Sequence, residues 1–308
     1  MEMTDKKLFR KDVRKTAGKV GIALIVCFII NSLLGFFADT INNSMQIDPQ
    51  IDIVSIFMIV SVTLGTVFLF LFFKPQKIHQ QLLAKNKSMT VGCFFILLCV
   101  IGSVQWVNIG ASAALEHLAN LFGFTFKTSI ETSSAGHDTI AMILYASLIG
   151  PVIEEIVFRG FVMRAFGKYG KIFAIIASSI LFGAYHGNIP QAIFAFFCGL
   201  VLGYIATEYG IIWSSILHVF NNFILGQIFV WCTQGINAQI KDTILLSIFG
   251  VFALVLVIAI IVNRKSIFDY LKENKWKSPF MRWTFSNVFV ILFLLIEVFS
   301  GVSMIRPM

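Results

Sequence analysis

The sequence predicts an all-α fold: a polytopic integral membrane helical bundle with about eight or nine transmembrane helices. Hydrophobic residues make up 57% of the 308 residues and charged residues only 13%, whereas a soluble globular domain carries about 25% charged residues. The apolar residues are gathered into runs close to the ~20 residues that cross a bilayer. Lipid offers no hydrogen bonds to the backbone, so each run is expected to be helical.

Nine such runs can be marked along the chain. They are Val20–Phe37, Ile53–Phe73, Val91–Ile109, Thr139–Met163, Ile172–Tyr185, Ile189–Thr207, Ile211–Trp231, Ile244–Val262 and Phe285–Val302. We predict three regions: N-terminal spans with an external loop (1–138), a central helical core (139–231) and C-terminal spans (232–308).

The basic residues indicate how the chain is oriented in the membrane. With the N-terminus in the cytoplasm, 20 of the 24 Lys and Arg residues fall in the predicted cytoplasmic segments, three fall outside, and Arg159 lies within the membrane. This asymmetry follows the positive-inside rule. The net charge of +8 is therefore attributed to cytoplasmic loops of a multi-pass cell-membrane protein. The partner it predicts is the lipid bilayer, not a nucleic acid.

The fourth run carries three ionisable residues, Glu154, Glu155 and Arg159. A charge within hydrocarbon costs about 3 kcal/mol or more, so such residues usually mark a functional site. Glu155 and Arg159 are four residues apart and share one helical face, which is the spacing of an ion pair. Glu154 points about 100° away and is free to face a cavity. The alternative is that Arg159 only anchors the helix at the inner interface.

Two later runs add polar residues at similar depth. His186 ends the fifth run, and His218 and Asn222 share one face of the seventh. Alone, His186 could be an interface residue, and the other two could join helices through hydrogen bonds. At about 1.5 Å per residue, however, all three lie at inner-to-middle depths, as Glu154 does. We therefore expect the four side chains to meet.

These residue types favour hydrolysis, by one of two schemes. A carboxylate beside a neutral imidazole can activate water for attack on a carbonyl, and N–H groups of imidazole and amide can stabilise the resulting oxyanion. Alternatively, Glu154, His186 and His218 supply the two-His, one-carboxylate set used by catalytic zinc or another divalent metal. No serine or cysteine stands in a recognised nucleophile motif. The residues leave both schemes open.

The segments Glu154-Glu155-x-x-x-Arg159, Phe182-x-x-x-His186 and His218-x-x-x-Asn222 occur in that order on successive spans. They resemble the three motifs of the CPBP family, the CAAX-prenyl-protease and bacteriocin-processing (Abi) intramembrane endopeptidases, over about residues 139–231. The resemblance implies that Glu154 activates water with help from His186, and that His218 and Asn222 form the oxyanion hole. It also implies that Glu155 and Arg159 hold Glu154 in place. It leaves open whether a metal takes part.

The predicted function is cleavage of a peptide bond in a membrane-embedded or lipidated substrate. The task is either CAAX-type processing or bacteriocin leader processing and self-immunity, and the residue usage favours a bacterial plasma membrane. Intramembrane Glu and His residues also serve proton relays, so a proton-coupled transporter is the alternative from another class. A third possibility is a non-catalytic membrane scaffold or immunity protein.

Overall fold

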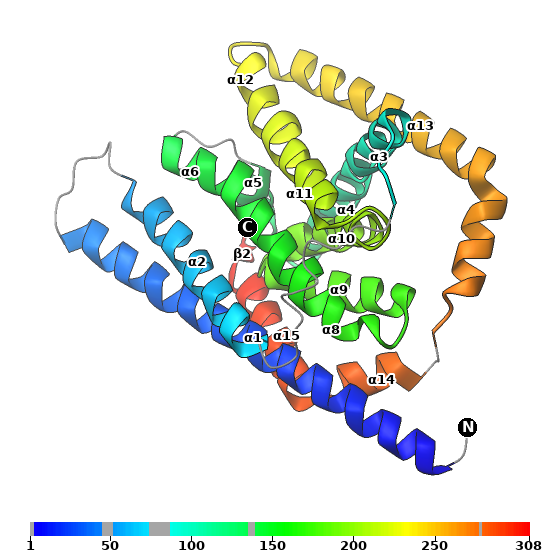
Figure 1. Ribbon diagram of the computed structural model, residues 1–308. Helices are drawn as coiled ribbons and strands as arrows, with labels where there is room; N and C mark the ends of the chain where they lie inside the picture. The colour runs from blue at the N-terminus through cyan, green and yellow to red at the C-terminus, as the bar shows by residue number, and fades with distance from the viewer. Residues whose placement is uncertain (1–2, 45–51, 74–86, 135–138, 277–278) are drawn as a thin grey trace.

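A computed structural model describes the whole chain except residues 1–2, 45–51, 74–86, 135–138 and 277–278 (Figure 1). The described residues are almost entirely helical. Two strands of two residues each, β1 (Phe124–Thr125) and β2 (Arg306–Pro307), pair antiparallel. The predicted all-α bundle is confirmed.

The described residues form fifteen α-helical and three π-helical segments. In chain order they are α1 (Met3–Ser44), α2 (Ile53–Phe73), α3 (Val91–Ser103), α4 (Gln105–Asn120), α5 (Lys127–Ser134), α6 (Ile140–Leu144), η3 (Tyr145–Ile149), α7 (Gly150–Glu155), η4 (Ile156–Val162), α8 (Met163–Gly167), α9 (Lys171–Tyr185), α10 (Ile189–Glu208), α11 (Ile211–Phe220), η5 (Asn221–Ile228), α12 (Phe229–Cys232), α13 (Ala238–Glu273), α14 (Pro279–Phe285) and α15 (Val288–Ser303). The segments labelled η are π-helical.

Each of the nine predicted runs corresponds to a helix. Among the described residues, seven helices are long and apolar enough to cross a membrane, and α14 with α15, bent by 67°, makes an eighth. The remaining run is α9, which has 15 residues and at 1.5 Å per residue is shorter than the ~30 Å hydrocarbon core. The chain is therefore a multi-pass membrane protein. The boundaries of the three predicted regions stay a prediction.

The hairpin of α9 and α10 is closely packed, because small residues line its contact. A Cβ added to Gly199 would lie 3.0 Å from the side chain of Ser179, and one added to Gly203 would lie 3.0 Å from Ile175. Gly199 and Gly203 are four residues apart, the small-residue spacing that lets membrane helices approach closely.

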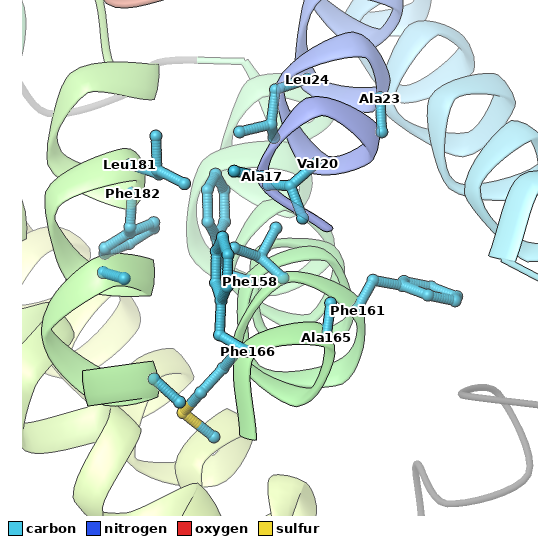
Figure 2. Packing of buried hydrophobic residues seen from close by; sticks show 14 of the residues in the cluster. Ala17, Val20, Ala23, Leu24, Phe158, Phe161, Ala165, Phe166, Leu181 and Phe182 are labelled. Atoms are coloured by element: carbon cyan, nitrogen blue, oxygen red, sulfur yellow. The ribbon is translucent and has the colours of Figure 1, made fainter. Parts of the chain in front are cut away.

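Phenylalanines of the fourth span fill the space between this hairpin and α1. Phe158 and Phe166 are fully buried, and Figure 2 shows them between α1, which contributes Val20 and Leu24, and Leu181 and Phe182 of α9. The rings of Phe158 and Phe182 meet edge to face, with centroids 5.0 Å apart. This packing fixes the fourth span against the helix that carries His186.

The fourth span is one continuous helix from Ile140 to Gly167, widened by the π-helical segments η3 and η4. At the end of η3, the Gly150 N–H donates to the Tyr145 carbonyl, five residues earlier. Pro151 follows and has no N–H for the Ala146 carbonyl in this register. The proline is accommodated by this wide π-helical turn, a feature frequent at functional sites.

Helix α13 lies at the edge of the bundle. Its main contact is with α3, and only 6% of its most apolar stretch is buried. Figure 1 shows it running along the outside before α14 and α15 return to lie beside α1. Its apolar side chains, such as Val257 and Ile261, therefore face lipid. The polar residues of interest lie elsewhere, in the packed centre.

The contact of α1 with α15 provides a test of the packing. A Cβ on Gly21 would lie 2.7 Å from the carbonyl carbon of Phe289, whereas a Cβ on Gly35 of the same helix meets nothing within 4 Å. We expect Gly21→Ala to destabilise the protein by about 1–3 kcal/mol, because the two backbones must separate. Gly35→Ala, the matched control, should be neutral or stabilising by up to about 1 kcal/mol. Thermal unfolding in detergent micelles measures both; equal effects would contradict the observed packing.

Candidate active site

A buried ion pair lies at the centre of the bundle. The Arg159 Nη1 atom is 3.0 Å from Glu155 Oε1, and both side chains are at most 1% exposed. Arg159 Nη2 also donates to the Gly199 carbonyl at 3.4 Å, and its guanidinium lies 4.3 Å from the centre of the Phe182 ring. The pair predicted from the four-residue spacing is present, and it connects the fourth span to α9 and α10.

His218 lies between the two glutamates. Its Nδ1 atom is 3.0 Å from Glu155 Oε1, and its Nε2 atom is 3.7 Å from Glu154 Oε2. An ionised carboxylate only accepts hydrogen bonds. The Nδ1 atom of His218 therefore carries a hydrogen and donates a hydrogen bond to Glu155. Glu155 and Arg159 therefore orient His218, and the structure shows no direct contact from either of them to Glu154.

Glu154 differs from its neighbour in exposure. Its side chain is 24% exposed, whereas that of Glu155 is fully buried. The distance of 3.7 Å to His218 is too long for a hydrogen bond. The Glu154 carboxylate is therefore accessible and is held beside an imidazole without being bound to it. This matches the prediction that helical geometry leaves Glu154 free.

His186 lies at the end of α9, and its ring and that of His218 both approach the ring of Phe182. Its ring centre is 4.9 Å from that of Phe182, and the His218 ring centre is 6.0 Å from it. Its Nδ1 atom is 2.9 Å from the Phe182 carbonyl, so Nδ1 is the donor and Nε2 of the neutral ring keeps a free lone pair. The structure records no contact between His186 and Glu154. The role predicted for His186 therefore stays a prediction.

Asn222 lies in the π-helical segment η5 and binds the fourth span. Its amide nitrogen donates to the Ala146 carbonyl at 3.1 Å, the group that Pro151 cannot satisfy. Its amide oxygen accepts a hydrogen bond from Asn221 at 3.0 Å. The amide has two N–H groups, and the contact with Ala146 uses one. Asn222 therefore joins α11–η5 to η3, whether or not it also contributes to an oxyanion hole.

The three side chains predicted for the metal alternative do not form a ligand set. Within the described parts of the chain, no three His, Cys, Asp or Glu side chains are placed to hold a metal ion. Glu154 and His218 are neighbours, but His186 turns its Nδ1 atom to a backbone carbonyl. The side chains as arranged do not fit the zinc scheme, and metal binding at Glu154, His186 and His218 stays a prediction.

Three groups at the site were not among the predicted site residues. The Phe182 ring approaches both histidines and covers Arg159, the Gly199 carbonyl binds Arg159, and the Ala146 carbonyl binds Asn222. Phe182 stands in the second motif and could have been found there. Gly199 could have been found from its spacing with Gly203. The Ala146 carbonyl has no sequence signal apart from the proline five residues later.

The buried pair yields a stability prediction. Arg159→Met leaves the Glu155 charge without its cation in an apolar interior, so we expect a loss of about 3–5 kcal/mol in unfolding free energy. Adding Glu155→Gln to Arg159→Met removes the isolated charge and should recover part of this loss. Thermal unfolding of the purified single and double variants in detergent checks both. A double variant no more stable than Arg159→Met would argue against an ionised Glu155.

Comparisons with known proteins find similar sequences for the part of the chain that carries the site. Residues 136–224 match the family described as type II CAAX prenyl endopeptidase Rce1-like. A protein of Bacillus subtilis (strain 168) named "Putative membrane peptidase YdiL" is 30% identical over 76 residues, which is 24% of this chain and 31% of that protein. The chain thus matches about a third of the length of this relative. No solved structure matches the chain. Residues 136–224, which carry all the predicted site residues, are thus similar to the Rce1-like CAAX prenyl endopeptidases, and the match confirms the resemblance predicted from the three motifs.

Proposed function

We propose that the chain is an intramembrane endopeptidase in which Glu154 activates a water molecule to hydrolyse a peptide bond of a membrane-associated substrate. The observation that supports this most directly is the placement of His218 between two carboxylates of different exposure. Glu155 is sealed and bound to Arg159, so it serves to orient His218. Glu154 is accessible, so it is the carboxylate that can meet water and substrate.

The proposed reaction uses the side chains in sequence. A water between Glu154 and His218 gives a proton to the Glu154 carboxylate, and its oxygen bonds to the carbonyl carbon of the substrate. The second N–H group of Asn222 stabilises the oxyanion that forms, and His218 donates to it from Nε2 when the ring is protonated, because its Nδ1–H is bound to Glu155. The proton then passes from Glu154 to the amide nitrogen, the C–N bond breaks, and an amine and a carboxylic acid are released. His186 assists through its Nε2 lone pair at the edge of the site.

The proposed mechanism routes no step through a metal, because the described residues do not assemble three ligands. We therefore expect turnover of the purified protein to survive dialysis against EDTA and then 1,10-phenanthroline. Elemental analysis of the same sample should find less than one zinc or other transition metal ion per chain. Loss of turnover on chelation that zinc then restores would favour the alternative in which Glu154, His186 and His218 are ligands.

The proposed setting is a bacterial plasma membrane with the N-terminus in the cytoplasm. It rests on the uneven distribution of basic residues: 20 of the 24 Lys and Arg residues lie in the segments predicted to be cytoplasmic. The proposed substrate is a membrane-embedded or lipidated peptide. Processing of a CAAX-type tail and processing of a bacteriocin leader, with self-immunity, are the two tasks that this chemistry fits.

Substitution of the proposed base tests the function. We expect Glu154→Gln to lower the cleavage rate about 10²–10⁴-fold, the usual contribution of a general base, because an amide cannot accept the proton of water. Glu131→Gln is the matched control, since Glu131 is exposed and pairs only with Lys127 at 3.8 Å. Comparative peptidomics of membranes from cells with each variant identifies the products, and a purified assay on those peptides measures the rate. Undiminished cleavage by Glu154→Gln would sink the assignment.

A further inference from the structure

A second feature of the bundle lies away from the glutamates, at the turn between α8 and α9. A cavity of about 150 Å³ is bounded there by α8, α9 and α10. Its lining includes Arg164, Gly167, Lys171, Ala174, Ala206 and Thr207. This volume is about five times the share of one molecule in liquid water. It is therefore large enough for a group such as a phosphate with part of an alkyl chain.

The charges around this cavity leave a positive excess. Lys171 Nζ is 2.9 Å from Glu208 Oε1, and Lys87 Nζ is 2.6 Å from Glu208 Oε2. The Tyr270 hydroxyl donates to the same carboxylate at 3.0 Å, so Glu208 is fully occupied. The hydrogen bond from Lys87 to Glu208 raises the pKa of Lys87 and keeps it charged. The described residues that line the cavity itself include two cations, Arg164 and Lys171, and no acidic side chain.

The position of the cavity indicates what kind of anion it meets. Arg164 lies near the end of the fourth span and Lys171 begins α9, so the cavity lies where the chain turns at the basic end of the bundle. The remaining lining residues are small or apolar. A cationic edge above an apolar floor, at the level of a bilayer surface, complements a lipid headgroup with its attached chains.

We propose that this cavity binds the phosphate of an anionic phospholipid headgroup between Arg164 and Lys171. The site is distinct from the proposed active site, because Arg164 is ten residues after Glu154 and therefore about 15 Å further along the helix. Lys171 has three N–H donors and Glu208 takes one of them, so two remain for the phosphate. The bound lipid would fix the turn between the two helices that carry Glu154 and His186.

Binding to the full-length protein in a nonionic detergent tests the proposal. We expect dioleoylphosphatidylglycerol to raise the thermal unfolding temperature saturably, and dioleoylphosphatidylcholine and inorganic phosphate to have little effect at the same concentration. Arg164→Gln should raise the half-saturating concentration of phosphatidylglycerol about fivefold or more, the usual effect of one basic residue at a membrane surface. Ala206→Leu should weaken it similarly, because the added side chain fills the cavity while every charge is kept.

Lys168→Gln is the matched control. Lys168 is a cation on the same turn, but it pairs with Asp12 at 2.6 Å and does not line the cavity. Equal weakening by Lys168→Gln and Arg164→Gln would show attraction to the surface alone and overturn the proposal. An equal response to phosphatidylcholine would also overturn it. If inorganic phosphate raised the unfolding temperature as much as phosphatidylglycerol does, and Arg164→Gln abolished this effect, the ligand would be free phosphate. That result would overturn the proposal of a lipid. The thermal stability of each variant without lipid is measured first, so that a misfolded variant is recognised. If Ala206→Leu or Arg164→Gln is misfolded, the other variant decides whether the proposal holds.

Discussion

The buried pair of Arg159 and Glu155 is the interaction on which the centre of this protein depends. Two charges removed from water each carry a penalty of several kcal/mol, which their mutual attraction offsets only if the remaining hydrogen-bonding groups also find partners. Arg159 finds the Gly199 carbonyl and the Phe182 ring, and Glu155 Oε1 finds His218, while Glu155 Oε2 has no hydrogen-bond partner in the described part of the chain. These partners come from α9, α10 and α11. A pair formed within one helix therefore requires three other helices to take fixed positions around it.

This requirement explains how two adjacent glutamates acquire different environments. Successive side chains on a helix diverge by about 100°, so burying Glu155 against α11 turns Glu154 toward the edge of the site. His218 lies between them: its Nδ1 atom binds Glu155 at 3.0 Å, and its Nε2 atom faces Glu154 at 3.7 Å without a hydrogen bond. The proposed base thus owes its position to the rotation of its own helix, and the burial of Glu155 is the structural condition for the exposure of Glu154.

The parts of the site that the sequence predicts are those that depend on a single helix. The nine spans, the pairing of Glu155 with Arg159 and the freedom of Glu154 all follow from helical periodicity and hydropathy, which are local. The contact of His218 with Glu155 depends on how α11 is rotated against the fourth span. The contact of Asn222 with Ala146 depends on two π-helical turns that displace both partners from α-helical register. Neither property is encoded in the spacing of polar residues. The sequence predicted that four side chains meet, whereas the structure places His218 beside Glu154, His186 against the Phe182 carbonyl and Asn222 against the Ala146 carbonyl.

Gly199 shows how packing and electrostatics are joined in this bundle. The absence of a side chain lets α10 approach Ser179 of α9, and the same approach brings the Gly199 carbonyl within reach of Arg159. Any larger residue would separate α10 from α9, and Arg159 would lose an acceptor that no water in the apolar interior could replace. The charge at the centre of the bundle is therefore tolerated because a small residue on a neighbouring helix allows the backbone itself to serve as a ligand.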